Sequence, residues 1–182
     1  MADIQPIYCP LCAARLEQRV VHNIPRDACP NCEYVHFLDP KVAVGALVED
    51  DHGRLLFTHR NHQPQMGAWA FPSGFVDRGE SVPDAVIREV REETGLDTAV
   101  DELLGVFSRP NDPVVFIVYR LHQIGGRLAP GPEAHDVRFF AEADFPPPAF
   151  PSDTDILAAW RDRRTASHDA ASHDAQKETP SG

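Results

Sequence analysis

The sequence has 182 residues, and it lacks any apolar run near the ~20 residues that a helix needs to cross a bilayer. Its first ten residues, MADIQPIYCP, have neither the basic start nor the apolar core of a secretory signal. We therefore expect no membrane association and a cytoplasmic location. Thiols stay reduced in the cytoplasm, so the few cysteines of this chain need a role other than cross-linking.

Positive charge is also scarce. Lysine and arginine number 17 against 28 aspartate and glutamate residues, which gives a net charge of −11 with histidine neutral. A protein whose main task is to hold phosphate backbones or anionic lipid needs the opposite balance. The composition therefore argues against nucleic acid or a membrane as the main partner.

Composition divides the chain into three segments. Residues 1–38 contain all four cysteines, and residues 39–165 contain almost all the long apolar runs. Residues 166–182 have no large apolar side chain and repeat the letters SHDA. Because such a segment cannot bury enough surface to offset the entropy of ordering, we expect it to be a disordered tail.

The middle segment alternates strand and helix patterns. Apolar runs at 42–50 and 54–60 flank an Asp-His-Gly turn and predict a hairpin. Further β-branched and aromatic runs cover 103–109, 114–122 and 137–140. Helices are predicted over 82–94 and 153–164. Strands interleaved with two helices indicate an α/β sandwich with a mixed sheet.

The four cysteines form two short pairs with the spacing C-x2-C-x16-C-x2-C: Cys9, Cys12, Cys29 and Cys32. Four thiolates at this spacing can close a tetrahedral Zn²⁺ site with no open position, which is typical of a structural metal in a zinc ribbon. A redox dithiol or two disulfides are the alternatives. Segment 1–38 has three arginines and four acidic residues, a net charge of −1, so we expect a stabilising or dimer-forming module that does not contact nucleic acid.

The helix expected at 82–94 lies within the stretch GFVDRGESVPDAVIREVREETGL, residues 74–96. At ~100° per residue, Glu89 and Glu93 fall on the apolar stripe of this helix, and Glu92 borders it. Crowded, partly buried carboxylates repel one another unless a cation compensates them. Oxygen ligands favour Mg²⁺ or Mn²⁺. Arg88 is placed to orient a carboxylate. A structural salt-bridge network is the alternative to a metal site.

The same stretch fits the pattern G-x5-E-x7-R-E-U-x-E-E-x-G-U, where U is a bulky apolar residue. The matching positions are Gly74, Glu80, Arg88, Glu89, Val90, Glu92, Glu93, Gly95 and Leu96. This resembles the Nudix hydrolase family. The resemblance implies a Nudix-type α/β/α sandwich over 39–165, preceded by a small zinc ribbon. It is similar to the branch that includes NADH, FAD and ADP-ribose pyrophosphatases.

The resemblance also implies a reaction and a site. Nudix enzymes hydrolyse the pyrophosphate bond of a nucleoside diphosphate linked to another moiety, such as ADP-ribose or FAD. By this likeness Glu89, Glu92 and Glu93 hold the catalytic Mg²⁺ or Mn²⁺, by which water is activated. Gly74 lets its loop pass close to the helix, and Gly95 suits the left-handed position that ends it.

Three points stay open in this likeness. Glu80 joins the site either through metal-bound water or by pairing with Arg88. The general base is a glutamate of the motif or an acid of a later loop, where Glu133 and Asp136 are the candidates. Family members are frequently dimers, which makes a homodimer an alternative to a monomer.

Two further comparisons bear on function. NADH pyrophosphatases of the zinc-ribbon branch carry the motif SQPWPFPxS, which the corresponding residues 103–120 lack. A second hypothesis is a nucleotide-sensing transcriptional regulator with a Nudix-like ligand domain and a ribbon that contacts DNA. The intact glutamate pattern and the net negative charge of the ribbon segment favour the hydrolase.

Overall fold

The computed structural model describes the backbone of residues 6–177 and the side chains of residues 6–166. The chain divides into two compact units after Pro40, two residues beyond the boundary expected from composition. The predicted disordered tail begins inside the second unit, and its last residues, 178–182, lie outside the described part. Within residues 6–177, no helix combines the length and apolar character needed to cross a membrane.

The first unit contains a two-stranded hairpin. Strands β1 (Glu17–Val21) and β2 (Ile24–Ala28) pair antiparallel. The two residues of the turn, His22 and Asn23, have φ of 52° and 63°, which suits the tight turns that join twisted strands. Isolated bridges join Tyr8 to Arg15 and Ala28 to Val35 on either side of the hairpin. The unit is therefore a small ribbon built around the cysteine pairs.

The second unit contains one seven-stranded sheet. Its strands are β3 (Lys41–Glu49), β4 (Leu55–Arg60), β5 (Trp69–Ala70), β6 (Ser73–Phe75), β7 (Leu96–Phe107), β8 (Val114–Gly126) and β9 (Ala134–Phe140). The strand order is β5-β4-β3-β8-β7, while β6 pairs with β3 and β9 pairs with β4. β3 and β8 run parallel and the other pairs antiparallel, so the sheet is mixed, as predicted.

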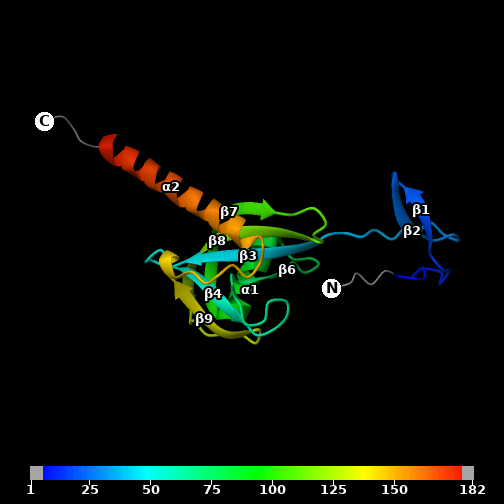
Figure 1. Ribbon diagram of the computed structural model, residues 1–182, viewed down its shortest axis with the longest axis horizontal. Coiled ribbons are helices and arrows are strands. Elements are labelled where there is room, and N and C mark those ends of the chain that lie inside the picture. Colours follow the sequence, from blue (N-terminus) through cyan, green and yellow to red (C-terminus); the bar gives the residue numbers. More distant parts are fainter. Residues whose placement is uncertain (1–5, 178–182) are drawn as a thin grey trace. The chain divides into compact units, whose positions relative to one another are not determined.

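Two helices cover the two faces of this sheet (Figure 1). α1 (Val82–Thr94) contributes Val86 and Val90 to a core that also contains Val44 of β3. α2 (Asp153–Lys177) contributes Trp160 to a second core that contains Leu47 of the same strand. A short 3-10 turn, η1 (Glu142–Asp144), precedes α2. Side chains from the two faces of β3 thus enter two different cores. The predicted α/β/α sandwich is confirmed.

The boundaries of α1 agree with the sequence signals. The Asp84 backbone N–H donates to the Ser81 hydroxyl at 3.3 Å, which caps the first turn. Gly95 has φ of 72°, and its N–H donates to the Arg91 carbonyl at 2.9 Å. A side chain at position 95 would strain this left-handed conformation, so glycine fixes the end of the helix.

Two boundaries differ most from the prediction. α2 continues to Lys177, so the helix expected to end at 164 extends through most of the segment expected to be a tail. The segment is rich in alanine, and lengthening an existing helix avoids the cost of nucleation. β7 begins at Leu96 and not near 103, because it pairs with β8 through three register shifts that interrupt its alternation.

Trp160 provides a test of the second core. Its side chain is 0% exposed, and its indole N–H donates to Glu49 Oε2 at 3.3 Å. We expect Trp160→Ala to lower the free energy of unfolding by about 3–5 kcal/mol, because it leaves a large cavity. Trp160→Phe, which keeps an aromatic ring, should cost less. Urea unfolding followed by circular dichroism measures both, and an unchanged midpoint for Trp160→Ala would contradict the packing described.

Candidate active site

A cleft of about 480 Å³ opens in the second unit beside β6 and α1. The residues that line it are Ser73, Gly74, Phe75, Asp77, Arg88, Glu89, Glu92, Glu93, Pro132 and Glu133. Five of these side chains are acidic and one is basic. So dense a negative charge in one hollow favours cations over anions.

α1 places its three glutamates at different depths in this cleft. Glu93 is 6% exposed, and the side chain of Glu89 is 14% exposed. The side chain of Glu92 is 59% exposed and lies at the rim. The helical projection anticipated this order, with two glutamates on the apolar stripe and the third beside it. The exposure of the three glutamates therefore increases from Glu93 through Glu89 to Glu92.

Glu93 is the most perturbed of these groups. Burial raises the pKa of Glu93 to about 8, and repulsion from Glu89 adds to the effect. The Ser73 backbone, the charge of Arg60 and the hydroxyl of Thr58 oppose this shift without cancelling it. Among the described residues, no hydrogen-bond partner reaches the buried Oε2 of Glu93. An acceptor buried without a donor is costly, and a cation satisfies it.

Glu89 is placed by a glycine on the facing strand. Burial raises the pKa of Glu89, while the hydrogen bond from Arg88 opposes the rise. A Cβ on residue 74 would lie 2.0 Å from the Glu89 carboxyl carbon. Only glycine therefore leaves room at Gly74 for the carboxylate between β6 and α1.

Arg88 connects three of the acids through its guanidinium. It donates to both oxygens of Glu80, at 2.7 and 3.0 Å, and this pairing lowers the pKa of Glu80. Its Nη1 donates to Glu89 at 2.8 Å and to Glu92 at 3.1 Å. Of the two roles open for Glu80, the structure shows the pairing. The salt-bridge network thus exists, but it does not include Glu93.

The two acids of the later loop differ in position. Glu133 lines the cleft, and its side chain is 68% exposed. Asp136 lies in β9 and pairs with Arg138 at 2.5 Å, and it does not line the cleft. Only Glu133 therefore shares the hollow with the glutamates of α1.

The loop before β9 is attached to the end of α1. The Gly131 N–H donates to the Glu93 carbonyl at 2.9 Å, and the Ala129 N–H donates to the Thr94 carbonyl at 2.9 Å. A Cβ on residue 131 would lie 1.9 Å from the Glu92 carbonyl oxygen. Sequence analysis did not identify Gly131. Its only signal is a glycine between two prolines, which indicates a turn without naming its neighbour.

The residues of the cleft fit a divalent cation. Glu89, Glu92 and Glu93 offer only carboxylate oxygens, and one oxygen of the buried Glu93 has no donor in the described chain. Hard oxygen donors are the ligands of Mg²⁺ and Mn²⁺. The same chemistry excludes these three side chains as a soft-metal site, which needs sulfur or nitrogen.

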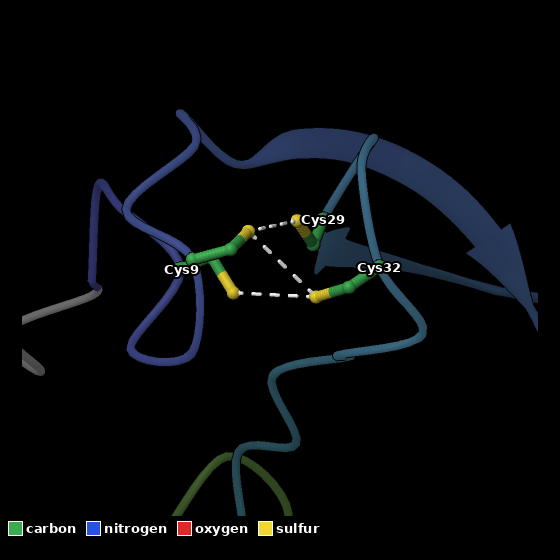
Figure 2. A group of neighbouring side chains, drawn as sticks. Cys9, Cys29 and Cys32 are labelled. Atoms are coloured by element: carbon green, nitrogen blue, oxygen red, sulfur yellow. Dashed lines mark hydrogen bonds between the residues drawn. The ribbon is translucent and has the colours of Figure 1, made fainter.

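The ribbon contains a second cluster, made of its four cysteines. Their sulfurs all lie within 4.8 Å of one another. Figure 2 shows Cys9, Cys29 and Cys32 turned toward a common centre. The Cys9 and Cys32 sulfurs are 3.6 Å apart, and those of Cys12 and Cys29 are 3.4 Å apart. A tetrahedral zinc ion with bonds of ~2.3 Å sets sulfurs about 3.8 Å apart, so the cluster is close to that geometry.

Backbone groups prepare these sulfurs for a cation. The Leu11 N–H donates to the Cys9 sulfur and the Asn31 N–H to the Cys29 sulfur, each at 3.4 Å. Although burial opposes it, the Asn31 hydrogen bond and the neighbouring thiols lower the pKa of Cys29 to about 7. Ionising one thiol makes it harder to ionise the next, and a bound cation removes that obstacle. The four cysteines can therefore hold a metal ion.

Comparison with known families matches residues 39–160 to the NUDIX domain. An ADP-ribose pyrophosphatase of Methanocaldococcus jannaschii is 43% identical over 122 residues, which cover 65% of this chain and 72% of that protein. The NAD-capped RNA hydrolase NudC of Pseudomonas aeruginosa is 26% identical over 141 residues, which cover 77% of this chain and 49% of that protein. The chain thus spans about half the length of the NudC relative.

The fold is also similar to that of a solved NUDIX hydrolase. The crystal structure of a NUDIX hydrolase from Nitrosomonas europaea superposes with a TM-score of 0.77 at 30% identity. The superposition covers 82% of this chain and 87% of that one. The helix that carries the three glutamates and the mixed sheet therefore belong to a fold that this hydrolase shares.

The raised pKa of Glu93 predicts a pH-dependent stability. The pKa of Glu93 is about 8 in the folded state against the 4.5 that is ordinary for a glutamate, so between these pH values the folded chain retains a proton that the unfolded chain releases. We expect the free energy of unfolding, measured without added divalent cation, to contain a contribution that is lost as pH rises from about 4.5 to about 8. Glu93→Gln should remove this contribution.

The control is Glu92→Gln, since that side chain is 59% exposed and should leave the pH dependence intact. Urea titrations at a series of pH values measure all three proteins. Equal pH dependence in wild type and Glu93→Gln would show that the buried carboxylate does not titrate as described.

Proposed function

Because this chain belongs to the Nudix hydrolase family, we propose that it hydrolyses the pyrophosphate bond of a nucleoside diphosphate linked to another moiety, with ADP-ribose as the leading substrate. The observation that carries this proposal is the acidic cleft with the buried Glu93 at its base. The carboxylates of this site can bind the cations that neutralise phosphates. The site is also open to solvent, so water and substrate can enter it.

In this proposal Glu89, Glu92 and Glu93 hold Mg²⁺ or Mn²⁺. A bound divalent cation supplies positive charge that neutralises the phosphates and makes water more acidic. Arg88 orients Glu89 and Glu92 through its two Nη1 hydrogen bonds, at 2.8 and 3.1 Å. Glu80 holds Arg88 in place from the other side.

Glu133 is the proposed general base. Its carboxylate shares the cleft with the glutamates of α1 and pairs with no arginine of the described residues, whereas Asp136 is paired with Arg138. Glu133 would take a proton from the water that attacks phosphorus, while the bond to the bridging oxygen breaks. With ADP-ribose the products are AMP and ribose 5-phosphate.

The choice of ADP-ribose rests on two comparisons. The archaeal relative that bears this substrate in its name is 43% identical and is spanned over 72% of its length. The NudC relative is 26% identical and is spanned over 49%, and residues 103–120 lack the motif of NADH pyrophosphatases. The cleft of about 480 Å³ also lies within the ~300–1,000 Å³ usual for small-molecule sites.

For the ribbon we propose a structural zinc ion bound by all four cysteines. Four sulfur ligands leave no position for substrate or water, so the ion would stabilise the fold of residues 6–40 and take no part in hydrolysis. A homodimer and the lack of nucleic-acid binding stay predictions from the sequence.

The substrate proposal is tested by incubating the protein with ADP-ribose, FAD, NADH and 8-oxo-dGTP, with and without Mg²⁺ or Mn²⁺. Nucleotide release is followed by chromatography. We expect the highest kcat/KM for ADP-ribose and no turnover without a divalent cation. Glu93→Gln should lower kcat/KM by at least about a hundredfold, because it removes a ligand of the cation whose charge would lower the barrier by several kcal/mol.

The matched control is Asp136→Asn, an acid outside the cleft, which should keep kcat/KM near that of wild type. Lack of turnover of every diphosphate by metal-loaded protein would refute the proposed reaction. Full activity of Glu93→Gln would refute the proposed cation site.

The zinc proposal is tested by metal analysis of reduced protein and of Cys12→Ser. We expect one zinc ion per wild-type chain and weaker retention in the variant, with a lower melting temperature of the ribbon. The intrinsic kcat of the second unit should change less than the stability. Reduced wild-type protein free of zinc would refute the proposal.

A further inference from the structure

The loop that carries Glu133 is held by the segment that follows β4. The Asn61 N–H donates to the Glu133 carbonyl at 3.2 Å, and the Asn61 side chain donates to the Pro132 carbonyl at 2.8 Å. His62 Nδ1 lies 3.2 Å from the same Glu133 carbonyl oxygen. Gly131 attaches the loop to α1 on its other side. Glu133 is therefore fixed through its backbone, although its side chain is exposed.

Arg60 determines which nitrogen of His62 carries the proton. The Arg60 guanidinium lies 2.9 Å from His62 Nε2, and a guanidinium can only donate. Nε2 must therefore accept, and the proton of the neutral ring is on Nδ1, from which it is donated to the Glu133 carbonyl. Arg60 is itself 7% exposed and held by the Pro64 carbonyl at 2.9 Å and the Phe150 ring at 5.4 Å. One tautomer of His62 is thus built into the fold.

The same ring lies beside the Glu133 carboxylate. His62 Nε2 is 3.5 Å from Glu133 Oε2. Because Nε2 accepts from Arg60, it offers a lone pair and no donor to this carboxylate, so His62 holds Glu133 through the backbone carbonyl and not through an ion pair. Glu133 is therefore held without the ion pair that occupies Asp136. A carboxylate held in this way keeps its lone pairs available to water.

We infer that His62 is a positioning residue for Glu133: the tautomer fixed by Arg60 ties the backbone of Glu133 and sets its carboxylate over the cleft without neutralising it. His62 does not contact the reacting atoms and acts through Glu133. The inference rests on the proposed function, in which Glu133 is the base. It assigns to the segment 60–62, which lies outside the glutamate motif of residues 74–96, a part in placing the proposed base.

The experiment is a double-mutant cycle on kcat with ADP-ribose and Mg²⁺. We expect His62→Ala to lower kcat by about tenfold or more and to change KM by less than about threefold, since misplacing a catalytic group by ~1 Å is costly. We expect Glu133→Gln to lower kcat further. The double variant should be no slower than Glu133→Gln alone, because a residue that acts only through Glu133 has no effect once the base is gone.

Two conservative variants separate the hydrogen bond from the bulk of the ring. His62→Asn can still donate from a position near Nδ1 to the Glu133 carbonyl, and it should recover kcat to within about threefold of wild type. His62→Phe keeps an aromatic ring without a donor and should behave like His62→Ala. Melting temperatures show that each protein is folded, and the Asn–Phe pair gives the same comparison if His62→Ala unfolds.

Three outcomes would overturn the inference. A loss in the double variant equal to the product of the two single losses would show that His62 acts independently of Glu133. Equal kcat for His62→Asn and His62→Phe would show that the hydrogen bond is irrelevant. Wild-type kcat in Glu133→Gln would show that Glu133 is not the base, so His62 would have no catalytic group to position. A cation-dependent reaction that Glu93→Gln abolishes would leave the proposed reaction and its cation site standing in all three cases, whereas lack of any turnover would overturn both the inference and the proposed function.

Discussion

A carboxylate buried without enough compensating charge is the constraint on which the site depends. Glu93 is 6% exposed, its pKa is raised to about 8, and no donor in the described chain reaches its Oε2. Arg88 pairs with three other acids and leaves Glu93 out, while the nearby charge of Arg60 lowers the pKa of Glu93 only partly. A divalent cation bound in the cleft would satisfy the orphan oxygen and screen the neighbouring glutamates.

Several features of the surrounding chain follow from bringing these acids together. Residue 74 lacks a side chain where a Cβ would lie 2.0 Å from the Glu89 carboxyl carbon, and residue 131 lacks one where a Cβ would lie 1.9 Å from the Glu92 carbonyl oxygen. The two glycines let a strand and a loop approach α1 from different sides. The cleft is thus formed by backbone placed close to the helix, and side chains supply its charge. An alanine at 74 would displace the Glu89 carboxylate, and an alanine at 131 would push the loop away from the backbone of α1.

The sequence was sufficient for the features that local pattern determines and insufficient for those set by tertiary contact. The period of a helix placed Glu93 on the buried face, and the cysteine spacing matched four sulfurs that lie within 4.8 Å. The length of α2, to Lys177, exceeded the prediction because its last turns carry no apolar stripe to mark them. His62 and Gly131 escaped notice because each matters through a backbone carbonyl of a distant residue. No side-chain pattern in one sequence reports such a contact.

The end of α1 links the cation site to the proposed base. A helix leaves its last carbonyls without partners and directs a partial negative charge toward its C-terminus, where Glu92 and Glu93 lie. That dipole disfavours ionised glutamates there and so increases the need for a cation. Residues 129 and 131 satisfy the carbonyls of Thr94 and Glu93, and Glu133 follows two residues later in the same loop before β9. Capping the helix therefore sets the distance between the base and the ligands, so a change that frays the last turn of α1 displaces both together.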